Sequence, residues 1–280
     1  AAGSTAAPDL EVKAAALDAR LASLGSVLVA YSGGVDSAFL AITAARVLGR
    51  SVLCVTADSP SYPDRHREIA LDTARAFALQ HEIIQTAEIE RPEYRANPAN
   101  RCYYCKHELY THLAGIARAR GLAAVVDGSN ADDRGDYRPG RQAAREFGVL
   151  SPLDEAGLTK TEIRALAKRA GLATWDEPAS ACLSSRIPYH SEVTTEKLRT
   201  IEAAERVLRG LGFRVFRVRH HDAIARLELG RDELARALDP VVSETIDRAL
   251  RTLGYSHVTV DLRGYRLGSL NEALTLRPVE

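Results

Sequence analysis

Short apolar runs alternate with longer amphipathic segments along the first part of the chain. The apolar runs predict buried strands, because consecutive residues, which point to opposite faces of a sheet, are hydrophobic and turn residues bound each run. They cover residues 26–31, 51–57, 82–85 and 122–127. Apolar positions at helical spacing run through residues 10–24, 38–48, 63–79 and 104–120. Buried strands that alternate with helices predict a parallel sheet covered by helices on both sides, which is an α/β fold.

The pattern changes after Pro188. A helix over 194–209 precedes two strands, 213–218 and 223–229, with His220, His221 and Asp222 at an exposed turn. A helical stretch over 232–253, broken at Pro240, precedes a last strand over 257–262. We therefore predict a smaller C-terminal α+β domain. The expected division is a flexible terminus over 1–8, a large α/β domain over 9–190, and an α+β domain for substrate binding and oligomerisation over 191–280.

Composition narrows the class of protein. The 280 residues carry a formal net charge of zero, and 46% of them are hydrophobic. A neutral chain lacks the basic excess typical of nucleic-acid-binding proteins, so we expect no nucleic-acid partner. No apolar run is long enough to span a bilayer, and residues 1–8 lack the features of a signal peptide, which favours a cytoplasmic protein without a membrane partner. Four cysteines in a chain of this size do not indicate a disulfide framework.

A glycine loop joins the first predicted strand to the next helix. Two glycines let the backbone turn sharply, and the helix start offers N–H groups and a partial positive charge to a phosphate. Asp36 is a candidate ligand for a magnesium ion that bridges phosphates. The loop lacks the lysine of the GxxxxGK[ST] motif and does not fit the GxGxxG dinucleotide motif. The candidate phosphate-binding residues are Ala30, Ser32, Gly33, Gly34, Asp36 and Ser37.

Polar residues also follow two other predicted strands. Asp58 ends the second strand, and Gly128 and Asn130 follow the fourth. Ligands of parallel sheets bind at the carboxyl ends of the strands, so these residues are expected to converge on the glycine loop.

The cysteines fall into two groups. Cys54 lies inside a predicted strand and reads as a core residue. Cys102 and Cys105 have C-x-x-C spacing at a predicted helix start, and Cys182 lies on a later loop between prolines. Three interpretations stay open: a structural zinc site with His107 as fourth ligand, a transient disulfide, or a [4Fe–4S] cluster held by three thiolates.

The Ser32–Ser37 loop resembles that of the PP-loop ATPases. The resemblance implies cleavage of ATP between the α- and β-phosphates, adenylation of an oxygen atom, and release of AMP and pyrophosphate. Five further stretches narrow the resemblance to the LarE family of ATP-dependent sulfur transferases, over nearly the whole chain. They are residues 101–106, 127–133, 137–140, 178–189 and 268–272.

The LarE resemblance implies a substrate and a reaction. Members act on pyridinium-3,5-biscarboxylic acid mononucleotide, whose carboxylates become thiocarboxylates of the nickel-pincer cofactor of lactate racemase. Adenylation gives the carboxylate a good leaving group, and a sulfur nucleophile then replaces AMP. ATP and Mg²⁺ are the implied cofactors, a homo-oligomer is expected, and the sulfide source stays open. By the same resemblance Arg101 joins the ATP-binding residues.

The resemblance also bears on the cysteines. One form of the family has only the cysteine that matches Cys182, which gives up its own sulfur. Other members carry a pattern like Cys102, Cys105 and Cys182 and use an iron–sulfur cluster. We therefore expect these three residues to be catalytic and to hold a [4Fe–4S] cluster, with sacrifice of Cys182 as the alternative.

Several polar residues near Cys182 and in the C-terminal domain are candidates for binding the substrate. Ser184, Ser185 and Arg186 offer two hydroxyls and a guanidinium fork, a good grip for the phosphate of a mononucleotide. Arg217 and Arg219 alternate on one face of a predicted strand and reach the substrate or form a solvated face. Glu228 on the next strand pairs with these arginines or binds a metal.

Three rival functions stay open at this point: a PP-loop tRNA thiolase, an amidating ligase that does without the three cysteines, and a nucleotide-binding metalloprotein without catalysis. Neutral charge and the lack of a recognisable RNA-binding module argue against the thiolase.

Overall fold

The computed structural model describes residues 6–135, 139–178, 181–266 and 268–272, without side chains for residues 6–8 and 135. Two compact units make up the chain. Unit 1 comprises Ala1–Ser59, Asp64–Glu88 and Cys102–Ala179, and unit 2 comprises Pro60–Pro63, Ile89–Arg101 and Ser180–Glu280. The expected division of the chain at residues 190 and 191 stays a prediction, as does a flexible terminus, of which residues 1–5 lie outside the described part.

Unit 1 contains the parallel sheet that the sequence predicts, so the α/β expectation is confirmed. Its strands are β1 (Val27–Ala30), β2 (Val52–Asp58), β3 (His81–Gln85) and β4 (Ala124–Val126), in the order β3-β2-β1-β4. All neighbouring strands are parallel, and Leu28 of β1 pairs with Leu53 of β2 and Val125 of β4. Their carboxyl ends therefore share one edge of the sheet.

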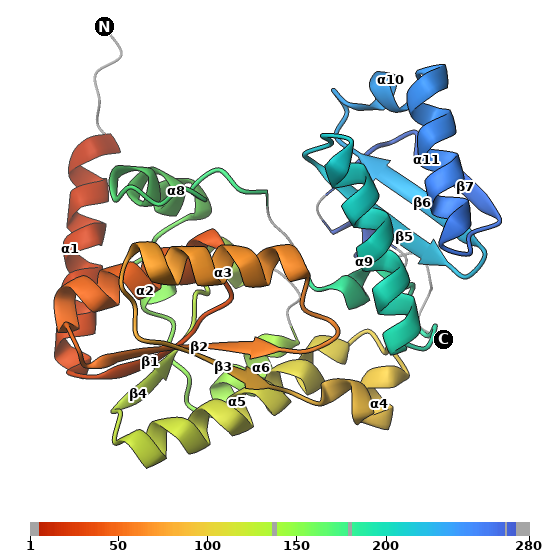
Figure 1. Cartoon of the computed structure of the whole chain (residues 1–280). Coiled ribbons are helices and arrows are strands. Elements are labelled where there is room, and N and C mark those ends of the chain that lie inside the picture. Colours follow the sequence, from red (N-terminus) through yellow and green to blue (C-terminus); the bar gives the residue numbers. More distant parts are fainter. Residues whose placement is uncertain (1–5, 136–138, 179–180, 267, 273–280) are drawn as a thin grey trace, which may run out of the picture. The chain divides into compact units, whose positions relative to one another are not determined.

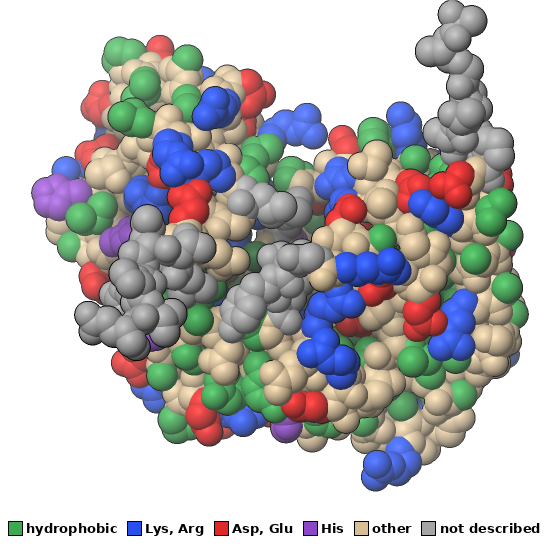
Figure 2. Space-filling view, turned by 180° about the vertical axis from the view of Figure 1, so that it is seen from behind, with side chains coloured by type: hydrophobic (Ala, Val, Ile, Leu, Met, Phe, Trp, Pro, Cys, Tyr) green, Lys and Arg blue, Asp and Glu red, His purple; other side chains and the backbone are tan. Residues whose placement is uncertain are grey.

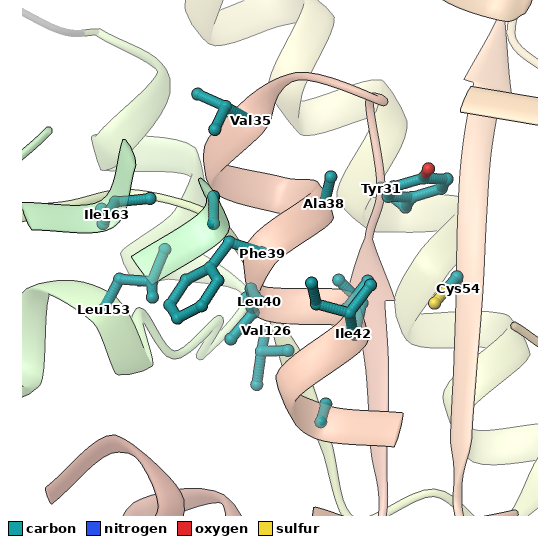
Figure 3. Packing of buried hydrophobic residues seen from close by; sticks show 14 of the residues in the cluster. Tyr31, Val35, Ala38, Phe39, Leu40, Ile42, Cys54, Val126, Leu153 and Ile163 are labelled. Atoms are coloured by element: carbon teal, nitrogen blue, oxygen red, sulfur yellow. The ribbon is translucent and has the colours of Figure 1, made fainter. Parts of the chain in front are cut away.

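Helices cover both faces of this sheet (Figure 1). One face carries α1 (Ala6–Leu24), α2 (Val35–Leu48), α3 (Asp64–Ala76), α7 (Pro152–Glu155) and α8 (Lys160–Arg169), and the other carries α5 (Arg101–Arg120) and α6 (Gly140–Glu146). Figure 3 shows Phe39 and Leu40 of α2 in the apolar core on the first of these faces, near Leu153 and Ile163. Burial of this apolar surface is the main force that holds α2, and hence the loop before it, against the sheet.

Unit 2 contains a small mixed sheet. Strands β5 (Phe216–His221), β6 (Ile224–Leu229) and β7 (His257–Val260) lie in that order, with β5 and β6 antiparallel and β6 and β7 parallel. Helices α9 (Thr195–Gly210), α10 (Leu234–Ala237) and α11 (Pro240–Thr252) contribute to its apolar core. Short elements complete the described chain: α4 (Pro92–Arg95) and the 3₁₀ turns η1 (Glu88–Glu90), η2 (Ala131–Gly135), η3 (Leu183–Arg186) and η4 (Ser269–Asn271).

The β5–β6 turn differs from the sequence expectation. Strand β5 extends through His221, and the turn lies at Asp222, which adopts a φ of +51°. His220 is buried rather than exposed, and its Nδ1 lies 2.9 Å from the Tyr255 hydroxyl. A buried partner outweighs the usual preference of adjacent histidines for a solvated turn.

The surface of each unit mixes charges of both signs, as Figure 2 shows for one face. None of the described helices is long and apolar enough to cross a membrane.

A phosphate loop in unit 1 and a cysteine loop in unit 2

The phosphate loop, residues Ser32–Ser37, leaves β1 and turns directly into α2. Ser37 closes it, because its Oγ accepts the Ser32 N–H at 3.1 Å and donates to the Gly34 carbonyl at 3.0 Å. Gly34 is the N-cap of α2 and has no side chain to satisfy the first N–H groups of the helix. These groups and the helix dipole form a site suited to a phosphate.

Two glycines allow the loop to pack closely. Gly33 has a φ of +69°, and a Cβ at this position would lie 2.8 Å from the Ala70 Cβ. Gly128 follows β4, and a Cβ there would lie 2.9 Å from the backbone nitrogen of Ser37. The structure thus brings Gly128 against the phosphate loop, as the convergence of strand ends predicts.

Asp36 lies in the first turn of α2 and forms an ion pair with Lys160 of α8. Among the described residues, no partner meets its other oxygen, Oδ1, which is buried. Burial raises the pKa of Asp36, and the Lys160 ammonium opposes that rise. A buried carboxylate oxygen without a partner fits the oxygen-ligand preference of magnesium.

Asp127 organises the end of β4. It is buried and accepts hydrogen bonds from Tyr110 at 3.0 Å, Ser151 at 2.8 Å and the Ser129 N–H at 3.1 Å. Asn130, two residues beyond Gly128, is also buried, and its Oδ1 accepts the Asp132 N–H at 3.1 Å. Asn130 therefore shapes its own turn.

Asp58 also has protein partners. Arg67 donates to its Oδ1 at 2.5 Å and Gln85 donates to its Oδ2 at 3.2 Å. Ala30 is the last residue of β1, directly before Tyr31 and the phosphate loop. The predicted ATP-binding residues of unit 1 thus lie on β1, on the loop and at the ends of β2 and β4.

The cysteine loop, residues 181–186, precedes and includes η3 in unit 2. The Cys182 carbonyl accepts hydrogen bonds from Ser185 Oγ at 2.7 Å and Arg186 Nη1 at 2.9 Å. The N–H of Leu183 donates to the Ser61 carbonyl at 2.9 Å, and the Ser184 hydroxyl lies 2.6 Å from that of Tyr94. The backbone around Cys182 is therefore fixed from several directions, while its side chain is only partly buried.

Arg186 is a buried part of this loop. Its Nε and Nη2 donate to the two oxygens of Glu205 at 2.8 and 3.0 Å, and its Nη1 donates to the Ala181 carbonyl at 2.6 Å. Burial raises the pKa of Glu205, but the Arg186 guanidinium more than offsets this and leaves the pKa below its usual 4.5. The fork that the sequence assigned to a substrate phosphate is occupied by protein partners here.

Arg217 and Arg219 are both buried on β5, so the solvated-face alternative is wrong. Arg219 donates to the Ser185 carbonyl at 2.6 Å and to Glu228 at 2.7 Å. Arg217 stacks over the Tyr265 ring, and burial followed by the charge of Arg186 lowers its pKa to about 10. The buried guanidinium groups of Arg186, Arg217 and Arg219 thus lie in or beside the cysteine loop, and Glu205 and Glu228 are buried with them.

Glu228 is fully buried and pairs with Arg219, as the sequence suggested, and with Arg226 at 3.2 Å. It also accepts the Ser269 hydroxyl at 3.0 Å, which links the segment 268–272 to β6. A metal role for Glu228 stays a prediction.

Arg101 is placed in unit 2, where its guanidinium donates to Asn97 and, at 2.9 Å, to the Ser184 carbonyl. Its protein contacts thus support the cysteine loop, and its expected contact with ATP stays a prediction.

Cys102 and Cys105 lie in the first two turns of α5 in unit 1, and Cys182 lies in unit 2. Cys102 is exposed and Cys105 half-buried, and the described structure has none of these cysteines in a disulfide. Within the described residues, no group of three or more His, Cys, Asp or Glu side chains is arranged to hold a metal ion. Tyr137, Arg138, Ala179 and Ser180 of the quoted stretches lie outside the described part.

Sequence reasoning missed Lys160, Asp127 and Glu205 as site residues. Thr159 and Glu162 mark a helix start by their spacing, but no spacing rule connects Lys160 with a carboxylate 124 residues away. Asp127 stood within a quoted stretch without an assigned role. Glu205 carries no local signal, because only the fold brings it to Arg186.

Comparisons with known proteins address the family directly. A family model described as asparagine synthase matches residues 11–105, which include the phosphate loop. A pyridinium-3,5-bisthiocarboxylic acid mononucleotide synthase of Lactiplantibacillus plantarum is 39% identical over 267 residues, 95% of this chain and 96% of that protein. The chain belongs to the LarE family.

Two other relatives are similar to this chain to different extents. An uncharacterized protein of Synechocystis is 44% identical over 95% of this chain and 99% of its own length. A probable tRNA sulfurtransferase of Methanothermobacter thermautotrophicus is 28% identical over 65% of this chain and 49% of its own length. As a LarE-family member with a PP-loop domain, the chain is an ATP-using enzyme.

Proposed function

We propose that this enzyme converts the carboxylates of pyridinium-3,5-biscarboxylic acid mononucleotide to thiocarboxylates, with ATP cleaved to AMP and pyrophosphate. The observation that carries the proposal is the end-to-end match to the synthase of Lactiplantibacillus plantarum. The product would be the thiocarboxylate precursor of the nickel-pincer cofactor of lactate racemase.

The reaction has two steps in this proposal. A substrate carboxylate oxygen attacks the α-phosphate of ATP, the bond to the β-phosphate oxygen breaks, and pyrophosphate leaves. A sulfur nucleophile then adds to the acyl carbon, and AMP departs with the former carboxylate oxygen. The phosphate loop supports the first step, because the N–H groups of α2 stabilise the charge of the phosphates.

Unit 2 would bind the substrate. We assign the substrate phosphate to the arginine-rich site made by Ser184, Ser185, Arg186, Arg217 and Arg219. Arg217 is a candidate for direct contact, because its guanidinium is buried on β5, stacks over the Tyr265 ring and lies near the charge of Arg186. Arg186 and Arg219 would act chiefly by holding the loop, since their donors engage Glu205, Glu228 and backbone carbonyls.

We further propose that Cys102, Cys105 and Cys182 hold a [4Fe–4S] cluster. The residue types suit such a cluster, which is held by cysteine thiolates, and Cys102 and Cys105 are three residues apart near the start of α5. When bound, the cluster would supply sulfide to the acyl adenylate. Sacrifice of the Cys182 sulfur is the alternative, and a homo-oligomer is the proposed assembly.

Anaerobic reconstitution with iron and sulfide tests the source of sulfur. We expect broad visible absorbance, repeated turnover in the presence of sulfide, and an unchanged protein mass afterwards. Cys102→Ser and Cys105→Ser should lose the absorbance. Cys54→Ala is the matched control, because Cys54 is buried in the β2 core and burial raises the pKa of its thiol to about 12.

A colourless protein with intact thiols would contradict the cluster. Loss of one H₂S from Cys182 after a single turnover would instead establish sacrifice. Failure to release pyrophosphate when ATP and the pyridinium substrate are both present would overturn the proposed function itself.

A further inference from the structure

Residues 268–272, the last described segment of the chain, reach the ion pair between β5 and β6. Ser269 lies in η4, and its Oγ accepts a hydrogen bond from Arg219 Nη2 at 2.6 Å. The same hydroxyl donates to Glu228 Oε2 at 3.0 Å. A hydroxyl has one proton and two lone pairs, so it can serve both charged groups at once. Ser269 thus completes a salt bridge that is buried in unit 2.

Arg219 connects Ser269 with the cysteine loop. Its two terminal nitrogens donate to the Ser185 carbonyl, to Glu228 and to the Ser269 hydroxyl. These three acceptors fix the plane of the guanidinium, because its donors stand in a rigid fork. The Arg219 Nε is buried and meets no acceptor among the described residues, so one donor remains for a ligand. Loss of the Ser269 acceptor would therefore free the guanidinium to turn.

Two further contacts hold the segment 268–272 in place. Asn271 Oδ1 accepts the hydroxyl of Tyr189, a residue that follows the cysteine loop closely, at 2.9 Å. Glu272 accepts the Nε of Arg266 at 3.0 Å. The segment is thus bound both to the chain beyond the cysteine loop and, through Ser269, to the arginine that supports the loop.

The segment depends on these polar contacts. No residue of η4 is buried, so little apolar surface holds it. An element of this kind opens locally at a low cost in free energy. Ser269 is also outside the apolar core of unit 2, which α9, α11 and the small sheet form. Removal of its hydroxyl should therefore loosen the segment without unfolding unit 2.

We propose that residues 268–272 form a clasp on the substrate site of unit 2 and that Ser269 is its positioning residue. The clasp holds Arg219 against the Ser185 carbonyl and so sets the shape of the loop that carries Cys182. The ligand class is that of the proposed function, a mononucleotide with carboxylate groups, and the inference rests on that function. Ser269 acts on this ligand through Arg219.

Isothermal titration of the full chain with the pyridinium mononucleotide and, separately, with ATP tests the role in binding. Ser269→Ala should weaken binding of the mononucleotide about tenfold, as expected for the loss of a hydrogen bond to a charged group. ATP affinity should stay near that of the unaltered chain, because the phosphate loop lies in unit 1. Ser269→Thr should keep most of the mononucleotide affinity, since it retains the hydroxyl.

Alkylation by iodoacetamide tests the clasp without any substrate. Ser269→Ala should speed the modification of Cys182 several-fold relative to that of the exposed Cys102. The physical reason is that Arg219 would hold the Ser185 carbonyl less firmly, which loosens the loop around the half-buried thiol. Peptide mass spectrometry measures both rates in one sample, and thermal unfolding shows whether each variant is folded.

Ser243→Ala is the matched control. It removes a serine hydroxyl of the same unit, which donates to the Pro240 carbonyl at the exposed start of α11, and it should change neither the affinities nor the ratio of rates. A Cys182 rate in Ser269→Ala equal to that of the unaltered chain would overturn the inference alone. An unaltered chain that does not bind the mononucleotide would overturn the proposed function, while the alkylation rates would still decide whether the clasp exists.

Discussion

At the scale of single residues, glycine decides how closely two backbones approach at the phosphate loop. Gly128 after β4 lies against the start of α2, where a Cβ would meet the Ser37 nitrogen at 2.9 Å and the Ser37 Cα at 3.1 Å. Both neighbours are backbone atoms of a packed helix, so neither can move aside cheaply. The close packing of the phosphate loop thus depends on the lack of a Cβ at Gly128.

Gly128→Ala should therefore weaken ATP binding by about tenfold or more, because overpacking of this kind costs about 1–3 kcal/mol. Gly115→Ala is the control, since Gly115 lies within α5 with nothing within 4 Å of the added Cβ. That change should leave ATP affinity unaltered and stabilise the helix by about 0.5–1 kcal/mol. Calorimetric titration and thermal unfolding measure the two effects. Equal ATP affinities in the two variants would contradict the close packing.

Sequence reasoning reached the residues of the loop because their chemistry is written in adjacent positions. Ser32, Gly33 and Gly34 predict a phosphate loop because they follow an apolar strand and precede a helix in the sequence. Arg186 and Arg101 show the limit, because residue type suggested a ligand contact for the first and resemblance suggested one for the second. The fold gives their donors partners in Glu205, Asn97 and backbone carbonyls. The sequence alone does not distinguish an arginine that binds a ligand from one that stabilises a loop by hydrogen bonds.

At the scale of elements, the strands of unit 1 were predictable because each is a short apolar run. The stretch from α6 to α8 was not, since its helices are short and their apolar positions few. Helix α5 begins at Arg101, three residues before the predicted start, so both cysteines lie inside the helix. Tertiary packing, which no local pattern contains, sets these boundaries.

Helix α8 yields a prediction of its own. Thr159→Ala removes the capping hydroxyl and should lower the free energy of unfolding by about 1 kcal/mol. It should also weaken ATP binding, because the start of α8 positions Lys160, which pairs with Asp36 of the phosphate loop. Thr194→Ala, at the N-cap of α9 in unit 2, should cost similar stability without that loss of affinity. Chemical denaturation and titration distinguish the two, and matched losses of ATP affinity would contradict the positioning.

At the scale of the whole molecule, buried charge makes the stability of unit 2 depend on pH. The pKa of Glu205 lies below its ordinary 4.5 when folded, with burial opposing and Arg186 favouring the charged form. The stabilisation is therefore present above pH 4.5 and is lost as the pH falls through the lower, folded pKa. The buried Arg186–Glu205 pair is a point at which acid weakens the fold.

Arg186→Met should cost about 3–5 kcal/mol at neutral pH, because it leaves the Glu205 carboxylate buried without its partner. The deficit should shrink as acid neutralises that carboxylate. Hydrogen exchange of the β5 amides measures this, since the Val218 N–H donates to Glu205 at 3.2 Å. Arg248→Met, which breaks an exposed pair with Glu244, is the control and should change little. A deficit that stays constant down to pH 3 would contradict the assignment.

Unit 2 is built from three separate segments of the chain, so the ribosome synthesises its parts at different times. The Cys182 loop contacts Tyr94 and Arg101, which are synthesised before it, and Arg219, which is synthesised after it. A nascent chain that has just exposed Cys182 still lacks β5 and the arginines it carries. The loop around Cys182 can therefore take its final form only after β5 has been synthesised, and any reaction that needs this form must wait for it.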